Sequence, residues 1–472
     1  MKSKYDVIII GAGIGGLVCG CYLEKQGISS IILERLNKPG GYCSSFKVNH
    51  HSFDVGPHSF GSCRKEGQIG KLIRELELES KLIFKQKSLS NIIKTPEYTV
   101  NFGNNVSKTI SSLQEIFPEE RKNIDGLFTL ITEKNFMYLY SQLKGKTFQQ
   151  ILDKFLKNHK LKTILGVLVG NLGLSPVSTA ALTAVILYRE HIFDGGYYPS
   201  EGTQKFSDVL ADKYQDLGGE IVFQSEVKKI LIKNNKAKGV ITRNEKFING
   251  NCIVSNCDAV HTYTKLIGEE NLDESFLETI HSLVPSPSFF VVHLGLTKPI
   301  KNSIIKCSTF WFLDSYDIET IYKDVRKSDV FTKRKYIVMG FPYLEKNEDE
   351  TDVISLLVLA SYKDGTEWEK DKNKLAESLI KQAKQILPEI SDNISSIWIN
   401  TPDFFNKYTF NSGGSISGWA STPEQVESNS IGLVGNVANL YHCGHWVTSP
   451  GGQGGIPMVI YSGKATAKKL ML

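Results

Sequence analysis

Residues 5–34 read YDVIIIGAGIGGLVCGCYLEKQGISSIILE, and this stretch decides the fold. An apolar run of strand length leads directly into GAGIGG, a helical pattern follows, and a second apolar run ends at Glu34. This order predicts a strand–helix–strand unit that carries the GxGxxG fingerprint in the context that dinucleotide binding requires. The alternative is a glycine-rich turn in another kind of α/β protein.

The glycines of this fingerprint have different roles. Gly11 allows the tight turn, Gly13 lets the backbone approach a pyrophosphate, and Gly16 lets the helix pack closely on the strand. The N-terminus of the helix offers free N–H groups to the phosphates. Glu34 stands where a carboxylate accepts hydrogen bonds from ribose hydroxyls. The stretch therefore predicts a dinucleotide site.

Composition bounds the remaining possibilities. A chain of 472 residues is long enough for two domains, and its 41% hydrophobic and 22% charged residues are ordinary for a globular protein. A net charge of +5 without a basic stripe argues against nucleic-acid binding. The eight cysteines form no CxxC pair, so no metal site is expected. The first predicted strand begins too early for a signal peptide, which makes the cytoplasm the expected location.

A second glycine cluster, HCGHWVTSPGGQGGIP, occupies residues 442–457 and precedes a helical pattern. A glycine turn that opens a helix presents backbone N–H groups and the positive end of the helix dipole. This pattern favours a second contact with the same ligand. A turn that only packs the C-terminus is the alternative.

Residues 164–188 carry no formal charge. The length suits a membrane span, but the glycines, Asn171 and Pro176 predict two short helices joined by a break at LSP. The lysines at 154, 157, 160 and 162 precede this stretch and leave two interpretations open. One is a peripheral membrane contact with anionic headgroups, and the other is a buried core segment with solvated lysines.

Other elements follow from periodicity. Residues 127–143 predict one helix and residues 368–387 an amphipathic helix, while residues 218–256 predict several strands joined by polar turns. Residues 289–296 and 336–341 predict two further strands.

Four blocks carry a family resemblance: the unit at 5–34, PGGYCSSF at 39–46, DGGYYPSEGTQKFSDVLADKYQDLGGEIVFQSEVKKI at 194–230, and NLYHCGHWVTSPGGQGGIPMVIYSGKATAKKL at 439–470. With them the sequence resembles the flavin-dependent amine oxidase and phytoene desaturase superfamily. Within it, the sequence is most similar to the branch of carotenoid desaturases, carotenoid cis–trans isomerases and retinol saturases. Two departures are Tyr42 with Cys43 after the second glycine pair, and Ser200-Glu201-Gly202 where the branch usually has a glycine pair.

The resemblance implies an α/β fold. A Rossmann-like FAD-binding domain of the glutathione-reductase type is expected to be interleaved with a mixed α+β substrate domain. The expected FAD-binding segments are 1–80, 200–275 and 425–472, and the expected substrate-domain segments are 81–199 and 276–424.

The resemblance also implies one noncovalent FAD, with its adenosine end on the first unit and its isoalloxazine at the C-terminal glycine loop. The backbone of Val227 would contact adenine, Gly444 would lie near the pyrophosphate, and residues 454–456 would lie near the ring. The residues expected to bind FAD are Gly11, Gly13, Gly15, Gly16, Glu34, Arg35, Gly41, Tyr42, Val227, Gly444, Gly454, Gly455 and Ile456.

Three residues are candidates for catalysis. His58 follows DVGP on a loop that the resemblance places near the flavin, and its pKa range suits acid–base chemistry. Glu190 and His191 follow the uncharged stretch, where they could exchange protons at the mouth of an apolar cavity. The alternatives are a histidine that packs the loop and ordinary surface charge at a helix end. His50 and His51 are expected to face solvent.

Only one dinucleotide fingerprint is present, so electrons are expected to pass between substrate, flavin and an acceptor such as a quinone or oxygen. The expected protein is an FAD-dependent oxidoreductase of the phytoene desaturase type. It would desaturate, saturate or isomerise C–C bonds of a hydrophobic isoprenoid or polyene small molecule. The alternatives are an amine-oxidase-like enzyme that oxidises a C–N bond and a flavin-free prenyl-binding chaperone of the same fold.

Overall fold

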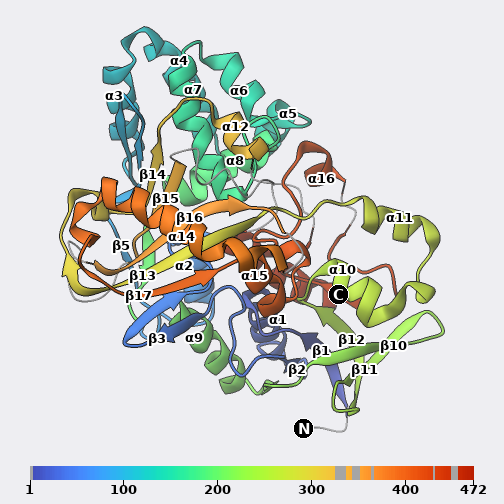
Figure 1. Ribbon diagram of the computed structural model, residues 1–472. Helices are drawn as coiled ribbons and strands as arrows, with labels where there is room; N and C mark the ends of the chain where they lie inside the picture. The colour runs from blue at the N-terminus through green and yellow to red at the C-terminus, as the bar shows by residue number, and fades with distance from the viewer. Residues whose placement is uncertain (1–3, 325–335, 343–350, 363–365, 429–430, 448–454) are drawn as a thin grey trace.

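The computed structural model describes residues 4–324, 336–342, 351–362, 366–428, 431–447 and 455–472. Two seven-stranded sheets form its framework. Figure 1 shows the first sheet at the bottom, the second sheet across the middle and a group of helices at the top.

The first sheet has the strand order β10-β11-β12-β1-β2-β9, and β18 pairs with β12. Strands β1, β2, β9, β12 and β18 run parallel, whereas β10, β11 and β12 form an antiparallel meander. A parallel sheet is covered on both faces, which is why its first strand is an unbroken apolar run. The bounds are β1 Tyr5–Ile10, β2 Ser30–Leu33, β9 Glu220–Val222, β10 Val227–Lys233, β11 Lys236–Thr242, β12 Phe247–Ser255 and β18 Leu440–His442.

Helix α1 (Ile14–Glu24) connects β1 to β2 and lies against α9 (Thr203–Asp216) and α17 (Ile456–Leu470). The glycines make this close packing feasible. A Cβ on Gly16 would lie 2.3 Å from the carbonyl oxygen of Gly11, and a Cβ on Gly463 would lie 2.5 Å from that of Gly15. The predicted strand–helix–strand unit is therefore present, and the C-terminal helix packs directly on it.

The second sheet has the order β17-β13-β16-β15-β14-β6-β7 and is antiparallel except for the pair β6 and β14. Strands β6 and β7 precede strands β9 to β12 of the first sheet along the chain, and β13 to β17 follow them. The chain therefore passes from one sheet to the other more than once. The predicted domain boundaries themselves remain a prediction. The bounds are β6 Leu89–Lys94, β7 Thr99–Phe102, β13 Ser288–Ile300, β14 Cys307–Leu313, β15 Tyr336–Gly340, β16 Thr351–Ala360 and β17 Ile394–Asn400.

Helices α3 to α8 gather above the second sheet (Figure 1). The single helix predicted over residues 127–143 is wrong, because the chain forms α4 and then α5. A new helix begins after Asn135, because the side chain of Asn135 accepts a hydrogen bond from the N–H of Tyr138 (3.1 Å) and caps the second helix. The bounds are α3 Val106–Ile116, α4 Arg121–Thr132, α5 Phe136–Leu143, α6 Phe148–Phe155, α7 His159–Gly166 and α8 Ala181–Leu187.

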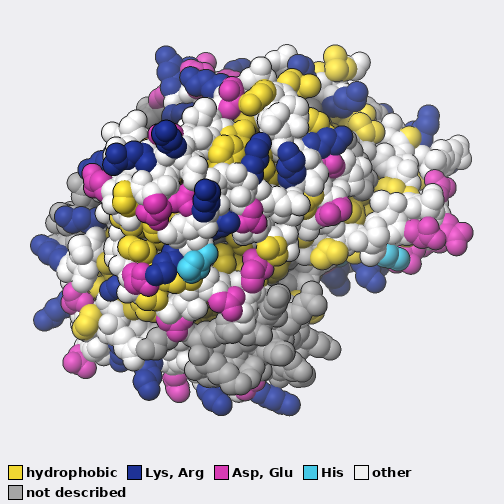
Figure 2. Space-filling view, turned by 90° about the horizontal axis from the view of Figure 1, so that it is seen from above, with side chains coloured by type: hydrophobic (Ala, Val, Ile, Leu, Met, Phe, Trp, Pro, Cys, Tyr) yellow, Lys and Arg dark blue, Asp and Glu magenta, His cyan; other side chains and the backbone are white. Residues whose placement is uncertain are grey.

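The uncharged stretch 164–188 forms the end of α7, a 3₁₀ turn at Val167–Leu172 and α8, which agrees with the predicted break. Most of its side chains are buried, so it is core. Lys160 pairs with Glu97, and Lys162 pairs with Asp153 (2.6 Å). In the described ranges no helix has the length and apolarity of a membrane span. Figure 2 shows this end of the molecule with basic side chains scattered among acidic ones.

The remaining elements connect these layers or cover their edges. They are β3 Ser45–Val48, β4 His51–Asp54, α2 Gln68–Glu75, β5 Phe84–Gln86, β8 Tyr197–Pro199, α10 Ala259–His261, α11 Glu274–Ser282, α12 Ile318–Asp324, α14 Thr366–Ile386, α15 Pro402–Thr409 and α16 Pro423–Glu427.

The prediction that His51 faces solvent is wrong, whereas His50 is exposed as predicted. His51 lies on β4, is 2% exposed, and places Nε2 2.9 Å from the carbonyl oxygen of Leu296. A Cβ on Gly295 would lie 2.3 Å from the His51 ring. The glycine in β13 thus makes room for the imidazole, a contact between distant segments that a local pattern does not reveal.

Two other buried histidines predict how stability depends on pH. Burial lowers the pKa of His293 to about 3 and that of His442 to about 4, from an ordinary value of 6.5. Both stay neutral in the folded chain and take up protons after unfolding below pH 6.5. The free energy of unfolding should therefore fall as the pH drops from about 6.5 toward 4. Urea denaturation at several pH values measures this slope.

A matched pair of variants tests whether the buried histidines cause this pH dependence of the stability. His442→Gln keeps a partner for the hydroxyl of Tyr263, which lies 2.8 Å from Nε2, and should flatten the slope. His50→Gln changes an exposed ring and should leave the slope unchanged. Equal slopes for wild type and His442→Gln would contradict this explanation.

Candidate functional site

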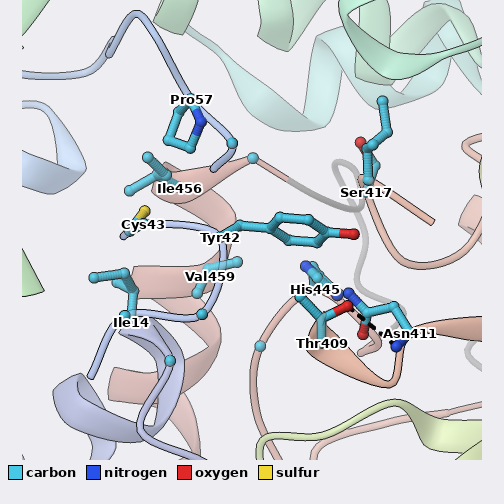
Figure 3. A pocket seen from close by; sticks show the side chains of 18 of the residues that line it. Ile14, Tyr42, Cys43, Pro57, Thr409, Asn411, Ser417, His445, Ile456 and Val459 are labelled. Atoms are coloured by element: carbon cyan, nitrogen blue, oxygen red, sulfur yellow. Dashed lines mark hydrogen bonds between the residues drawn. The ribbon is translucent and has the colours of Figure 1, made fainter. Parts of the chain in front are cut away.

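One cavity of about 590 Å³ receives side chains from both sheets. It reaches from Ile10 and Leu33 at the ends of β1 and β2 to Trp311 and Val338 on the second sheet. The loop after β2, the start of α1 and the start of α17 meet between these ends (Figure 3). Segments from both termini therefore build one site.

At one end of the cavity lie Gly11, Gly13 and Gly15. Helix α1 begins after Gly13, and no described side chain caps it, so the N–H groups of its first turn are left for a ligand. A Cβ on Gly15 would lie 2.9 Å from the N atom of Gly444. The two glycine loops are thus in contact, and both line the same space.

Glu34 stands at this end and is buried. Its carboxylate accepts hydrogen bonds from the N–H groups of Ala12 and Leu36, both at 2.7 Å. Burial raises the pKa of Glu34, and these two hydrogen bonds oppose that effect. The bonds also hold the carboxylate still, and its remaining lone pairs can accept hydroxyl groups.

Arg35 donates to the carbonyl oxygen of Tyr408, and its guanidinium lies 4.1 Å from the ring centroid of Phe410. It therefore ties the C-terminal end of α15, together with Phe410, to the end of β2. Val227, at the start of β10, lines the cavity beside it. Gly16 does not appear in the cavity wall, because its role is the close packing of α1 on the turn.

Tyr42 crosses the middle of the cavity (Figure 3). Its hydroxyl donates to the carbonyl oxygen of Ser415 (2.8 Å), and its ring lies 6.1 Å from that of His445. Burial raises the pKa of Tyr42 to about 12, so the phenol stays protonated. The preceding Gly41 has a φ of +58°, which a glycine adopts without strain.

Helix α17 faces the same region. Gly455 precedes its first residue, Ile456, and both line the cavity. No described side chain caps the helix, and the loop that precedes it, residues 448–454, lies outside the described residues. Gly454, which the sequence also proposes for this loop, lies outside the described residues.

His58 lines the cavity from the loop after β4. Its Nε2 lies 3.0 Å from the hydroxyl of Thr309 on β14. A Cβ on Gly340 would lie 2.6 Å from the imidazole, so the ring rests against the second sheet. Burial lowers the pKa of His58 to about 4, and the imidazole is therefore neutral at pH 7.

Glu190 and His191 also reach the cavity. Burial alone would raise the pKa of Glu190, but hydrogen bonds from Arg64 (2.8 Å) and Ser62 (2.7 Å) lower it. The carboxylate is thus ionised and held in place. Burial lowers the pKa of His191 to about 4. The sequence gives no sign of the role of Arg64, because no local pattern marks a residue that pairs with a helix 126 positions away.

The part of the cavity that the second sheet lines is a mostly apolar chamber, with Asn171, Thr183 and His58 among its polar side chains. The other chamber residues are Leu172, Ile186, Leu187, Phe289, Val291, Trp311, Val338 and Leu357. They come from the uncharged stretch and from strands β13 to β16. These residues could not be predicted from the sequence, because strand and helix patterns do not show which faces pack against each other.

The family model of flavin-containing amine oxidoreductases matches residues 14–471. The chain belongs to this family. It is 23% identical to prolycopene isomerase from Daucus carota, over 93% of this chain and 75% of that protein. It is 23% identical to 1-hydroxycarotenoid 3,4-desaturase from Flavobacterium, over 98% of each chain. It is 21% identical to all-trans-retinol 13,14-reductase from Danio rerio, over 89% of this chain and 78% of that protein.

Solved structures of other oxidoreductases share the fold. An oxidoreductase from Methanosarcina mazei superposes with a TM-score of 0.70 at 17% identity, covering 98% of this chain and all of that one. Putrescine oxidase bound to putrescine superposes with a TM-score of 0.68 at 14% identity, covering 99% of each chain. The predicted fold is confirmed: an α/β Rossmann-like domain interleaved with a mixed α+β substrate domain.

The described residues fit the flavin that the family name specifies. A Cβ on Gly15 would meet Oδ1 of Asn256 at 2.5 Å and the N atom of Gly444 at 2.9 Å, so a glycine lets the two loops lie close together at this end of the cavity. Two helices, α1 and α17, begin at the cavity with no side-chain cap among the described residues, and the hydrogen-bonded carboxylate of Glu34 lies at one end. Free N–H groups suit phosphates and an electron-rich ring edge, and a carboxylate suits ribose hydroxyls.

Proposed function

We propose that this flavin-family member is an FAD-dependent oxidoreductase that acts on C–C bonds of a hydrophobic polyene or isoprenoid. One observation carries the proposal: a single cavity joins the glycine loops and Glu34 to the apolar chamber. A cofactor and an apolar substrate can therefore come into contact inside the cavity, away from bulk solvent. The relatives named as acting on prolycopene, hydroxycarotenoid and retinol support the same substrate class.

In this proposal FAD lies along the cavity and is bound noncovalently. Glu34 and Val227 hold the adenosine end, and Gly11, Gly13 and Gly444 hold the pyrophosphate. The ring lies beside Tyr42 and the start of α17. Arg35, Gly15, Gly41 and Ile456 complete the contacts that the sequence proposes.

A bound flavin supplies two-electron chemistry, and the protein supplies position and proton control. The apolar chamber aligns the chain of the substrate and excludes water. His58 offers a neutral imidazole that can accept a proton and is held by Thr309. Glu190 is paired with Arg64, so we assign it to orienting the site rather than to protonating the substrate. A quinone or oxygen would accept the electrons in a desaturation.

The amine-oxidase alternative fits the chamber less well. A cationic amine would lose its hydration among apolar side chains, at a high energetic cost. Glu190, a carboxylate in the cavity wall, is already paired with Arg64. The chaperone alternative requires a protein without flavin, so the colour of the purified protein distinguishes it from the enzyme.

Anaerobic mixing tests the proposed function. Prolycopene, a phytoene-type polyene, all-trans-retinol and putrescine would each be added to oxidised and to dithionite-reduced protein, with flavin absorbance and product chromatography as readouts. We expect flavin oxidation, flavin reduction or a changed polyene isomer with at least one of the three isoprenoids. Flavin bleaching by putrescine, with no change in any isoprenoid, would overturn the proposal in favour of amine oxidation.

A further inference from the structure

Asn256 lies between the two glycine loops, in the wall of the cavity. It directly follows β12, which pairs in parallel with β1 on one side and with β18 on the other. The carboxyl ends of these three strands therefore meet at one edge of the sheet, where parallel sheets bind their ligands. At this edge β1 leads into Gly11, and β18 leads into Cys443 and Gly444.

The backbone of Asn256 is fixed by both neighbouring strands. Its N–H donates to the carbonyl oxygen of Ile10 (3.0 Å), and the N–H of Cys443 donates to the carbonyl oxygen of Ser255 (3.1 Å). These bonds continue the pairing of β12 one step beyond the strand itself. The sheet therefore determines where the side chain of Asn256 begins, which makes its position precise.

The side-chain amide of this residue contacts both loops. Nδ2 donates to the carbonyl oxygen of Gly11 (3.3 Å), and Oδ1 accepts a hydrogen bond from the thiol of Cys443 (3.5 Å). A Cβ on Gly15 would lie 2.5 Å from Oδ1, and a Cβ on Gly444 would lie 2.7 Å from it. The amide thus occupies the space between the loops, and it sets the distance between them.

A neutral amide suits this position, whereas a carboxylate does not. Glu34, at the end of β2, lies where the proposal places the ribose, but Asn256 lies where it places the pyrophosphate. A Cβ on Gly13, at the start of α1, would lie 2.8 Å from Nδ2. A carboxylate here would repel the phosphates, and it could not donate to the carbonyl oxygen of Gly11.

We infer that Asn256 is a positioning residue for the pyrophosphate of the cofactor. Its amide holds the two glycine loops at the spacing that the phosphates require, and it does so without adding a negative charge. The inference rests on the proposed FAD site and extends it to a residue outside both glycine clusters. The two motifs alone do not reveal this residue, because β12 brings it to them from the middle of the chain.

Binding of FAD tests this role without requiring turnover. Full-length protein would be purified with its flavin and diluted serially, and the fluorescence of the released flavin would be followed. Variants that purify without flavin would be titrated with FAD. Asn256→Leu keeps the approximate shape and removes both hydrogen bonds, so its dissociation constant should rise about tenfold. Asn256→Asp adds a charge beside the phosphates, so its dissociation constant should rise at least about 100-fold.

Melting temperatures separate this role from simple packing. Without FAD, Asn256→Asp should melt above Asn256→Leu, because a carboxylate interacts favourably with the N-terminus of α1. A packing role predicts that affinity follows stability, so that Asn256→Asp would bind FAD more tightly than Asn256→Leu. We expect the opposite order of affinities.

ADP locates the effect along the cofactor, because it carries the adenosine and the pyrophosphate but no flavin ring. Its affinity should fall in the same order, from wild type to Asn256→Leu to Asn256→Asp. Asn251→Asp is the matched control, since it makes the same change at an exposed position of the same strand. This control should bind both ligands as wild type does.

The outcomes distinguish this inference from the function beneath it. A dissociation constant for FAD within about threefold of wild type in Asn256→Asp would overturn the role of Asn256 and leave the flavin proposal standing. Tighter binding of FAD by Asn256→Asp than by Asn256→Leu would do the same. If wild type itself does not bind FAD, the proposed cofactor is contradicted instead.

Discussion

Gly13→Val protein should fold and purify almost free of flavin. Gly13 lines the cavity at the start of α1, and a Cβ there would meet only the amide end of Asn256, at 2.8 Å. That side chain can shift, so the fold should tolerate the change. The added bulk keeps a pyrophosphate from approaching the backbone, and flavin occupancy should fall by at least about tenfold.

Flavin content is measured by absorbance after acid precipitation, which also tests noncovalent binding. For wild type the flavin should remain in the supernatant, and colour in the pellet would contradict noncovalent attachment. Gly432→Val is the control, because a Cβ at Gly432 meets no described atom within 4 Å. If Gly13→Val protein is as yellow as wild type, the cofactor assignment fails.

His58→Ala should slow flavin reduction by substrate, or substrate reduction by flavin, about 100-fold, the usual contribution of one acid–base group. The imidazole is neutral at pH 7, faces the cavity and is held by Thr309. Because burial lowers the pKa of His58 to about 4, the wild-type rate should not change through this group between about pH 6 and 8. Stopped-flow absorbance measures both the rate of flavin reduction or oxidation and its pH dependence, with the substrate that the anaerobic mixing experiment identifies.

A packing role for His58 predicts a different pattern. The loop would loosen, the melting temperature and flavin content would fall, and the rate per bound flavin would stay near that of wild type. His50→Ala, which removes an exposed ring, controls for general effects of losing a histidine. A rate per flavin within twofold of wild type in His58→Ala would leave only the packing role.

Local patterns were sufficient for several features. The run at 5–34 predicts the strand–helix–strand unit because its apolar spacing, its glycines and Glu34 all act within one short segment. The break inside 164–188 could be predicted for the same reason, since glycine and proline act on their own backbone. Both glycine clusters were predicted to be ligand-binding loops, and the structure brings Gly15 and Gly444 close together at one cavity.

Tertiary structure alone decided the rest. His51 is buried because Gly295, on a distant strand, leaves room for its ring. Glu190 forms an ion pair with Arg64 because the fold brings the two residues together. The helix predicted over 127–143 divides because Asn135 caps a new start. A sequence pattern shows which face of a helix or strand is apolar. Which faces pack against each other is set by contacts between distant segments, and those contacts determine which residues meet at this site.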